Sequence, residues 1–168
     1  EKFIYNKDLF GTNLRLTEIQ SFAGLEQLKC LKQTQKKRQK IAKDYFKLIS
    51  KYKKYFFSYY PPKQIRSAWY RFYFFIKPNI RNYKKIRLDI IRDLNKRNLR
   101  CFSGSCPEIY LEKSFKKLKN FKIKRLKNCK ILGETSLALD VNHTLNLWQH
   151  KKDLLKIKRV IEKFIKDK

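Results

Sequence analysis

The sequence predicts an α+β fold in which a short sheet is covered by helices and is entered by a long helix. Apolar residues recur at three- and four-residue steps near the beginning, middle and end of the chain, which indicates helices. An aromatic run from Ser67 to Ile76 interrupts this pattern and is typical of a strand. Shorter apolar segments at 99–101 and 135–141 add two more strands. These helices and strands would bury their apolar sides if the helices packed on one small sheet.

The first helix is predicted to begin at Thr17. The Thr17 side chain can accept a hydrogen bond from the amide of Gln20, and Gln20 can reach back, as in a capping box. Five apolar residues then share one helix face: Ile19, Phe22, Leu25, Leu28 and Leu31. Residues 32–40 are wholly polar, and Ile41 restores the apolar spacing. The pattern predicts one long helix, or two in series with a kink near Leu31.

The remaining elements follow from the same two periodicities. The run 67–76 is apolar at nearly every position, which favours a core strand buried on both faces over an exposed base-stacking platform. In chain order we then expect a helix over 82–98, a strand over 99–101, a small-residue loop over 102–107, helices over 108–117 and 123–130 with a stop at Gly133, a strand over 135–141 and a last helix over 148–166.

Composition excludes several classes of protein. The chain has 168 residues, with 43 Lys and Arg against 14 Asp and Glu, a formal net charge of +29. Its uncharged apolar runs fall short of the ~20 residues of a membrane span. Its 42% hydrophobic content argues against a disordered basic tail. The charge suggests a nucleic-acid partner. However, the 32 lysines are spread along the chain, and the other residue types encoded by A/T-rich codons are also abundant, which is typical of a biased genome. We therefore favour a solvated basic surface over a nucleic-acid interface.

Cysteine and histidine spacing predicts no metal site. Four cysteines occur, at 30, 101, 106 and 129, without a Cys-x-x-Cys pair, and two histidines lie at 143 and 150. We expect reduced thiols in a cytoplasmic protein, since no signal peptide is visible. The serines near Gly104 have no neighbouring histidine to act as a base. Residue patterns alone therefore predict no catalytic residue.

Three segments carry a resemblance to a known family. Residues 11–20, Gly11-Thr12-Asn13-Leu14-Arg15-Leu16-Thr17-Glu18-Ile19-Gln20, are followed by Gly24-Leu25 and Gln27-Leu28. Residues 101–113 read CFSGSCPEIYLEK, and residues 132–137 read LGETSL. In this order they resemble the signature segments of the DegT/DnrJ/StrS-type sugar aminotransferases, which are pyridoxal-phosphate enzymes of fold type I.

The resemblance implies that the chain is the carboxy-terminal part of such an enzyme. Residues 1–16 would end the large cofactor-binding domain, and residues 17–168 would form the small carboxy-terminal domain. The family's Schiff-base lysine lies upstream of these segments, so this chain alone is expected to be inactive. The absence of Met agrees with a missing amino-terminal half. The family also implies a homodimer and pyridoxal 5'-phosphate bound mainly by the large domain.

The resemblance also suggests site residues. Asn13 matches the family Asn that reaches the cofactor phosphate of the other subunit, although it could be a simple turn residue. Arg15 could bind a substrate carboxylate or phosphate, or it could pair with Glu18. Ser103 and Ser105 would line the substrate entrance, or would belong to a plain loop. The segment 102–107 lacks the family's usual histidine, which leaves the identity of the sugar open.

The implied activity of the whole enzyme is amino transfer, with glutamate as the expected donor, to a keto group on a nucleotide-linked sugar. The product would enter polysaccharide or modified-sugar biosynthesis. Two alternatives stay open. One is a basic module that binds single-stranded nucleic acid through the charge and the aromatic run at 69–75. The other is a non-catalytic scaffold that dimerises through the family interface.

Overall fold

The computed structural model describes residues 15–104, 107–112 and 124–166. The chain divides into two units, Glu1–Gln33 and Thr34–Lys168. Helix α1 (Glu18–Ser50) begins in the first unit and continues into the second. The second unit then holds, in chain order, β1 (Phe56–Ser58), β2 (Arg71–Ile76), α2 (Tyr83–Lys96), β3 (Cys101–Phe102), a 3-10 turn (Ile109–Leu111), α4 (Lys127–Thr135), β4 (Ser136–Asp140) and α5 (Leu147–Lys166). This order confirms the α+β class.

The first unit contains the predicted helix start. The amide of Gln20 donates to Thr17 Oγ1 at 3.3 Å, and the amide of Thr17 donates to Gln20 Oε1 at 3.0 Å. This reciprocal pair is a capping box that satisfies backbone donors at the helix end. The helix runs on as one element through the polar stretch. Six large apolar side chains ahead of residue 32 are between 53% and 82% exposed: Leu16, Ile19, Phe22, Leu25, Leu28 and Leu31.

The second unit is built on a four-stranded antiparallel sheet in the order β1-β2-β4-β3. In the central pair, Phe72 lies opposite Leu139 and Phe74 opposite Leu137. Burial alternates along β2, since Phe72 and Phe74 are buried whereas Tyr73 between them is only half-buried. The expectation of burial on both faces is therefore wrong. An antiparallel sheet needs a cover on one face only, and the other face can stay open to solvent.

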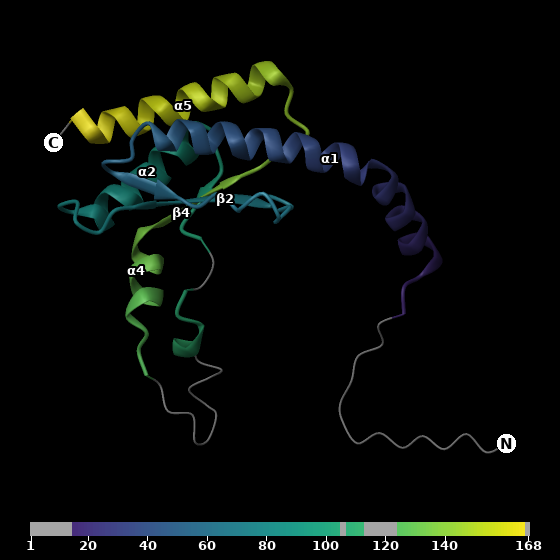
Figure 1. Ribbon diagram of the computed structural model, residues 1–168, viewed down its shortest axis with the longest axis horizontal. Helices are drawn as coiled ribbons and strands as arrows, with labels where there is room; N and C mark the ends of the chain where they lie inside the picture. Colours follow the sequence, from purple (N-terminus) through teal and green to yellow (C-terminus); the bar gives the residue numbers. More distant parts are fainter. Residues whose placement is uncertain (1–14, 105–106, 113–123, 167–168) are drawn as a thin grey trace. The chain divides into compact units, whose positions relative to one another are not determined.

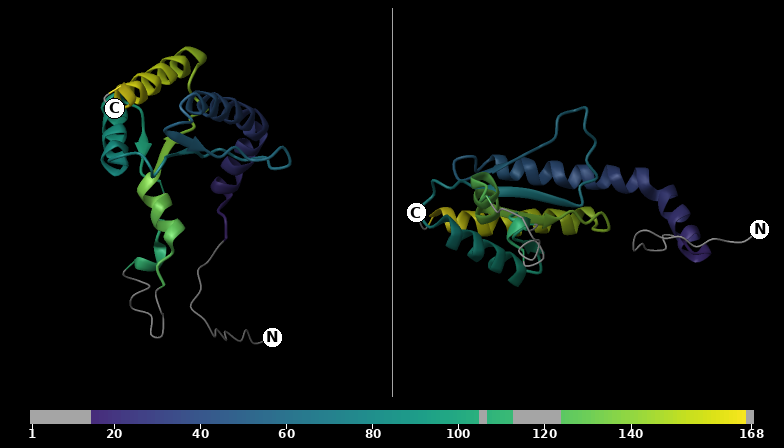
Figure 2. Two further views of the ribbon diagram at one scale, coloured as in Figure 1. Left: turned by 60° about the vertical axis from the view of Figure 1, so that its left-hand side comes forward. Right: turned by 90° about the horizontal axis from the view of Figure 1, so that it is seen from below.

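Three helices supply that cover and form one core with the sheet. Figures 1 and 2 show α5 and the second-unit part of α1 on the same side of β2 and β4, with α2 beside them. The buried residues come from every one of these elements: Ile41, Ala42, Tyr45, Leu48 and Ile49 of α1, Ile90 and Leu94 of α2, Ile157, Val160 and Ile161 of α5, and Phe72, Phe74, Ile76, Cys101, Leu137 and Leu139 of the sheet. Burial of this apolar surface is the main stabilising contribution to the unit.

Two local predictions differ from the structure. Gly133 does not stop a helix but lies inside α4, and a Cβ at this position would overlap the ring of Pro107. Gly133 is thus needed because it lets Pro107 pack closely against α4, and it does not end the helix. Strand β1 was not predicted, because its three residues are too few to show a period. The expected helix over 108–117 is described only as the turn Ile109–Leu111, and residues 113–123 lie outside the described part.

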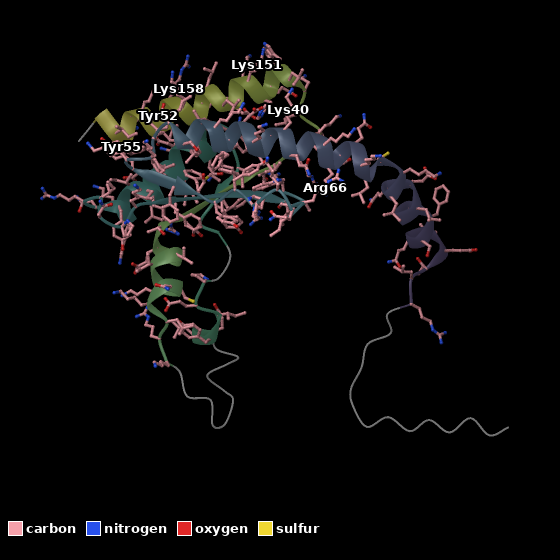
Figure 3. All side chains as sticks on the ribbon, in the orientation of Figure 1. Lys40, Tyr52, Tyr55, Arg66, Lys151 and Lys158 are labelled. Atoms are coloured by element: carbon pink, nitrogen blue, oxygen red, sulfur yellow. The ribbon has the colours of Figure 1, made fainter. Side chains whose placement is uncertain are left out.

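Positive charge is spread over several elements of the second unit. Lys40 on α1, Lys151 and Lys158 on α5, and Arg66 in the β1–β2 connection are all exposed (Figure 3). Within the described ranges, no helix is both long enough and apolar enough to cross a membrane.

Candidate functional site

The predicted substrate loop begins where β3 ends, against the start of β4. The Ser136 hydroxyl donates a hydrogen bond to the backbone oxygen of Ser103. Gly104 follows with a backbone φ of +90°, a conformation that residues other than glycine rarely adopt. A Cβ on Gly104 would lie 2.9 Å from Ser136 Oγ and 3.2 Å from Tyr73 Cε1. Gly104 therefore lets the backbone of this loop lie close to β4 and β2.

The residues that follow this loop are held by charged and phenolic groups. Glu108 accepts two hydrogen bonds from the Arg125 guanidinium, at 2.9 Å and 3.0 Å. The Tyr110 hydroxyl donates to Glu108 at 3.0 Å and accepts from the amide of Leu126 at 3.0 Å. The bidentate contact with Arg125 lowers the pKa of the Glu108 carboxyl below its ordinary value. These contacts tie residues 108–110 to the segment that leads into α4.

A second polar cluster joins α2 to the end of α4 and the start of β4. Glu134 accepts from Lys84 Nζ at 2.8 Å and from the Tyr83 hydroxyl at 2.9 Å. The contact with Lys84, followed by that with Tyr83, lowers the pKa of the Glu134 carboxyl. Arg87 Nε donates to the backbone oxygen of Ser136 at 2.9 Å. The sequence could not indicate the partners of Glu134, because Tyr83 and Lys84 lie 51 and 50 residues earlier in the chain.

The structure describes two of the four site residues predicted from the sequence. Ser103 is exposed in the second unit and Arg15 is exposed in the first. Asn13 and Ser105 lie outside the described residues. The grouping of these four residues into one site stays a prediction.

The cysteines and histidines show no catalytic arrangement in the described ranges. Cys30, Cys101 and Cys129 are free thiols, and burial raises the pKa of the Cys101 thiol to about 12, which keeps it protonated. His150 Nε2 lies 3.1 Å from Asp44 Oδ2 and so joins α5 to α1. No group of three or more His, Cys, Asp or Glu that could hold a metal ion occurs among residues 15–104, 107–112 and 124–166.

Comparison with solved structures identifies the class of fold. The chain is similar to the X-ray structure of the aminotransferase from Psychrobacter cryohalolentis, at 31% identity and a TM-score of 0.78, covering 96% of this chain and 43% of that one. It is also similar to Helicobacter pylori PseC, an aminotransferase involved in the biosynthesis of pseudoaminic acid, at 25% identity and a TM-score of 0.76, covering 95% and 43%.

For a third structure, the similarity to this chain shows only a common fold. The Escherichia coli GDP-4-keto-6-deoxy-D-mannose-3-dehydratase, solved with bound hydrated PLP, matches at 22% identity and a TM-score of 0.70, covering 89% of this chain and 37% of that one. The chain thus has the fold of one part of aminotransferase-like enzymes, and it spans less than half the length of each of these three structures. No curated protein matches it at a significant level.

The match to a family profile is equally extensive. The DegT/DnrJ/EryC1/StrS aminotransferase family matches residues 1–159. The chain belongs to this family.

Proposed function

We propose that this chain acts as the carboxy-terminal part of a pyridoxal-phosphate-dependent aminotransferase that transfers an amino group, with glutamate as the donor, to a nucleotide-linked keto-sugar in the cytoplasm. The observation that carries the proposal is the family match over residues 1–159. The domain boundary at 16/17 belongs to the same proposal. Residues 1–16 would complete the large domain, and the enzyme would be a homodimer that feeds polysaccharide or modified-sugar biosynthesis.

The exposed apolar face of the first unit supports a partner of this kind. Six large apolar side chains between Leu16 and Leu31 are mostly solvent-exposed. Soluble proteins rarely leave so many large apolar side chains of one short segment uncovered. The solved relatives carry more than half of their length outside the matched region. We therefore assign this face to the amino-terminal, cofactor-binding part of a family enzyme.

The loop at Ser103 supports a role beside the substrate. Gly104 and Ser136 hold its first residues against the sheet, and Glu108 and Arg125 hold the residues that follow it. A loop residue that is held against a rigid sheet, as Ser103 is, can present its side chain to a ligand. Bound pyridoxal phosphate would supply the electron sink for amino transfer. Asn13 would contribute one amide donor to the cofactor phosphate, and Ser103, Ser105 and Arg15 would contact substrate.

Co-expression tests this proposal. The 168-residue chain would be produced together with the unmatched amino-terminal part of the Psychrobacter cryohalolentis aminotransferase. Glutamate-dependent amination of a nucleotide-linked keto-sugar would then be measured in the purified mixture. We expect activity that neither part shows alone. A mixture that forms a stable complex, holds the cofactor and still aminates no such sugar would contradict the proposed substrate class.

A variant pair tests the role of Asn13. Asn13→Ala should reduce the amount of cofactor retained by the complex, because one donor to the phosphate is lost. Asn128→Ala, at an exposed position of α4, is the matched control and should leave retention unchanged. Equal retention in both variants would remove Asn13 from the cofactor site.

A further inference from the structure

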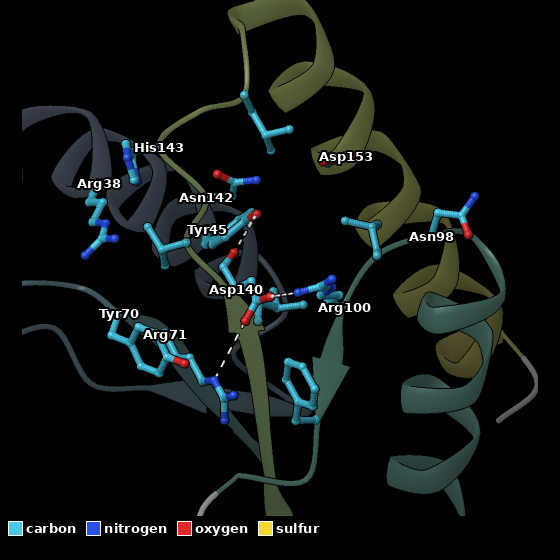
Figure 4. Close-up of a pocket in the computed structure, with 15 residues that line it drawn as sticks. Arg38, Tyr45, Tyr70, Arg71, Asn98, Arg100, Asp140, Asn142, His143 and Asp153 are labelled. Atoms are coloured by element: carbon cyan, nitrogen blue, oxygen red, sulfur yellow. Dashed lines mark hydrogen bonds and ion pairs between the residues drawn. The ribbon is translucent and has the colours of Figure 1, made fainter. Parts of the chain in front are cut away.

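A cavity of about 530 Å³ lies at the opposite end of β4 from the loop at Ser103, and three arginines line it. Arg38 comes from α1, Arg71 begins β2, and Arg100 precedes β3 (Figure 4). All three belong to the second unit. We call this cavity the arginine pocket. Neither the sequence motifs nor the proposed site uses it.

The guanidinium groups of the arginine pocket have more donors than the surrounding acids satisfy. Asp140 faces two of them, but its oxygens lie 3.7 Å from Arg71 Nε and 4.0 Å from Arg100. A direct charge-assisted hydrogen bond is about 2.7–2.9 Å long. Asp153, the other acid in the lining, pairs with Lys156 at 3.2 Å. In the described part of the chain, Arg38 Nε and Arg71 Nε are buried without a hydrogen-bond partner.

Aromatic rings hold the central arginine in place. The Arg71 guanidinium lies 4.4 Å from the centre of the Phe102 ring and 5.2 Å from that of Tyr70. Stacking on aromatic faces is a favoured setting for guanidinium groups and restricts their rotation. Burial, followed by the positive charges of Arg38 and Lys37, lowers the pKa of His143, which lines the pocket.

We propose that the arginine pocket binds the phosphate group of a small phosphorylated molecule. Guanidinium groups match phosphate oxygens in pairs, and a phosphate dianion can accept from several of them at once. A single carboxylate offers fewer acceptors, and Asp140 already supplies one. The side-chain amides of Asn98 and Asn142 and the ring of Tyr70 line the remaining space. A volume of about 530 Å³ exceeds that of phosphate alone and lies in the usual range for organic ligands.

Calorimetric titration of the 168-residue chain tests this site without the cofactor or the amino-terminal part. Inorganic phosphate, a hexose phosphate and a nucleoside monophosphate serve as probes. We expect one molecule bound per chain, with an organic phosphate binding more tightly than inorganic phosphate. Arg38→Gln and Arg100→Gln should each weaken binding at least roughly tenfold, since a charged partner is removed. The Arg100 side chain is 81% exposed, so its replacement should leave folding intact.

The basic surface requires a matched control. Arg92→Gln removes an equal charge from α2, where Arg92 pairs with Asp89 at 3.0 Å away from the pocket. Binding by this variant should stay within about twofold of the original, because nonspecific attraction falls only slightly when one of many charges is lost. No binding, equal weakening by all three variants, or several bound molecules per chain would overturn the proposal. Preference for an oligonucleotide over the small phosphates would overturn it as well.

Discussion

At the scale of single residues, two glycines in helices have opposite surroundings. A Cβ on Gly133 would overlap Pro107 Cγ and lie 3.0 Å from Pro107 Cβ, in a ring that cannot rotate away. A Cβ on Gly24 would meet nothing within 4 Å. The same substitution should therefore have opposite effects on the free energy of unfolding at the two positions.

We expect Gly133→Ala to destabilise the chain by about 1–3 kcal/mol, as overpacking commonly does. Gly24→Ala should be neutral or stabilising by up to about 1 kcal/mol, because alanine favours a helix. Chemical denaturation followed by circular dichroism measures both. Equal stability of the two variants would show that Pro107 does not pack against Gly133.

Glu134 gives a prediction about acid stability. Its contacts with Lys84 and Tyr83 lower its pKa below the ordinary value of 4.5. A carboxyl with a lowered folded pKa stabilises the fold above pH 4.5 and loses that contribution as pH falls through the folded value. Glu134→Gln cannot titrate, so its stability should fall less steeply below pH 4.5 than that of the unchanged chain. Parallel acid dependences in the two proteins would contradict this assignment.

Residue-scale features differed in how far the sequence predicted them. The capping box of Thr17 and Gln20 was predictable, because both partners lie within one helical turn. The contact of Gly133 with Pro107 and that of Glu134 with Lys84 were not, because each joins residues whose approach depends on the packed fold. Partly buried, reduced thiols were expected; the described thiols are free, but Cys30 is exposed, whereas Cys101 is buried and Cys129 half-buried.

At the scale of elements, the sheet has one buried and one half-open face. Phe74 of β2 is buried and contacts the ring of Phe56, with centroids 5.8 Å apart. Its neighbour Phe75 is half-buried and stacks on Phe57, which is exposed. An apolar run could not reveal this difference, because the sequence records hydrophobicity and not which face the helices cover.

The two faces should respond differently to truncation. Phe74→Ala should cost about 3–5 kcal/mol of unfolding free energy, as for other buried aromatic residues. Phe75→Ala should cost clearly less, because part of its ring already contacts solvent. Denaturant titration of both variants measures the contrast. Similar losses would mean that both faces are covered, as the sequence pattern suggested.

Element types and order were predictable over most of the described chain, because long periodic segments such as α2 and α5 carry their own signal. The exact ends of the helices and strands were less predictable. Strand β3 occupies Cys101–Phe102 rather than 99–101, and α4 runs to Thr135 through Gly133. Short elements take their limits from neighbouring strands and loops, which local patterns do not contain.

At the scale of the whole molecule, the family could be inferred from three ordered motifs, and the profile match over residues 1–159 confirms it. The candidate site could be inferred only in part. Its residues lie in two separately described units, and Asn13 and Ser105 fall outside the described ranges. The arginine pocket was not predicted, since Arg38, Arg71 and Arg100 meet only through the sheet and α1.

The central claim is that the chain works as one part of a larger cofactor-binding aminotransferase. Its apolar face on α1 would then be an interface, and replacing Ile19 and Phe22 with serine should abolish association. Leu88→Ser, at an exposed apolar position of α2, is the matched control because it lies in the other unit. The two variants separate loss of this interface from a general effect of removing surface hydrophobic groups.

The most direct measurement is co-elution in size-exclusion chromatography of the chain with the amino-terminal part of the Psychrobacter cryohalolentis aminotransferase, followed by the absorbance of bound pyridoxal phosphate. We predict one cofactor-bearing peak that contains both chains, that persists with Leu88→Ser and that is lost when Ile19 and Phe22 are replaced. Separate elution of the unchanged chains, or a complex that persists in the doubly substituted variant, would contradict the account.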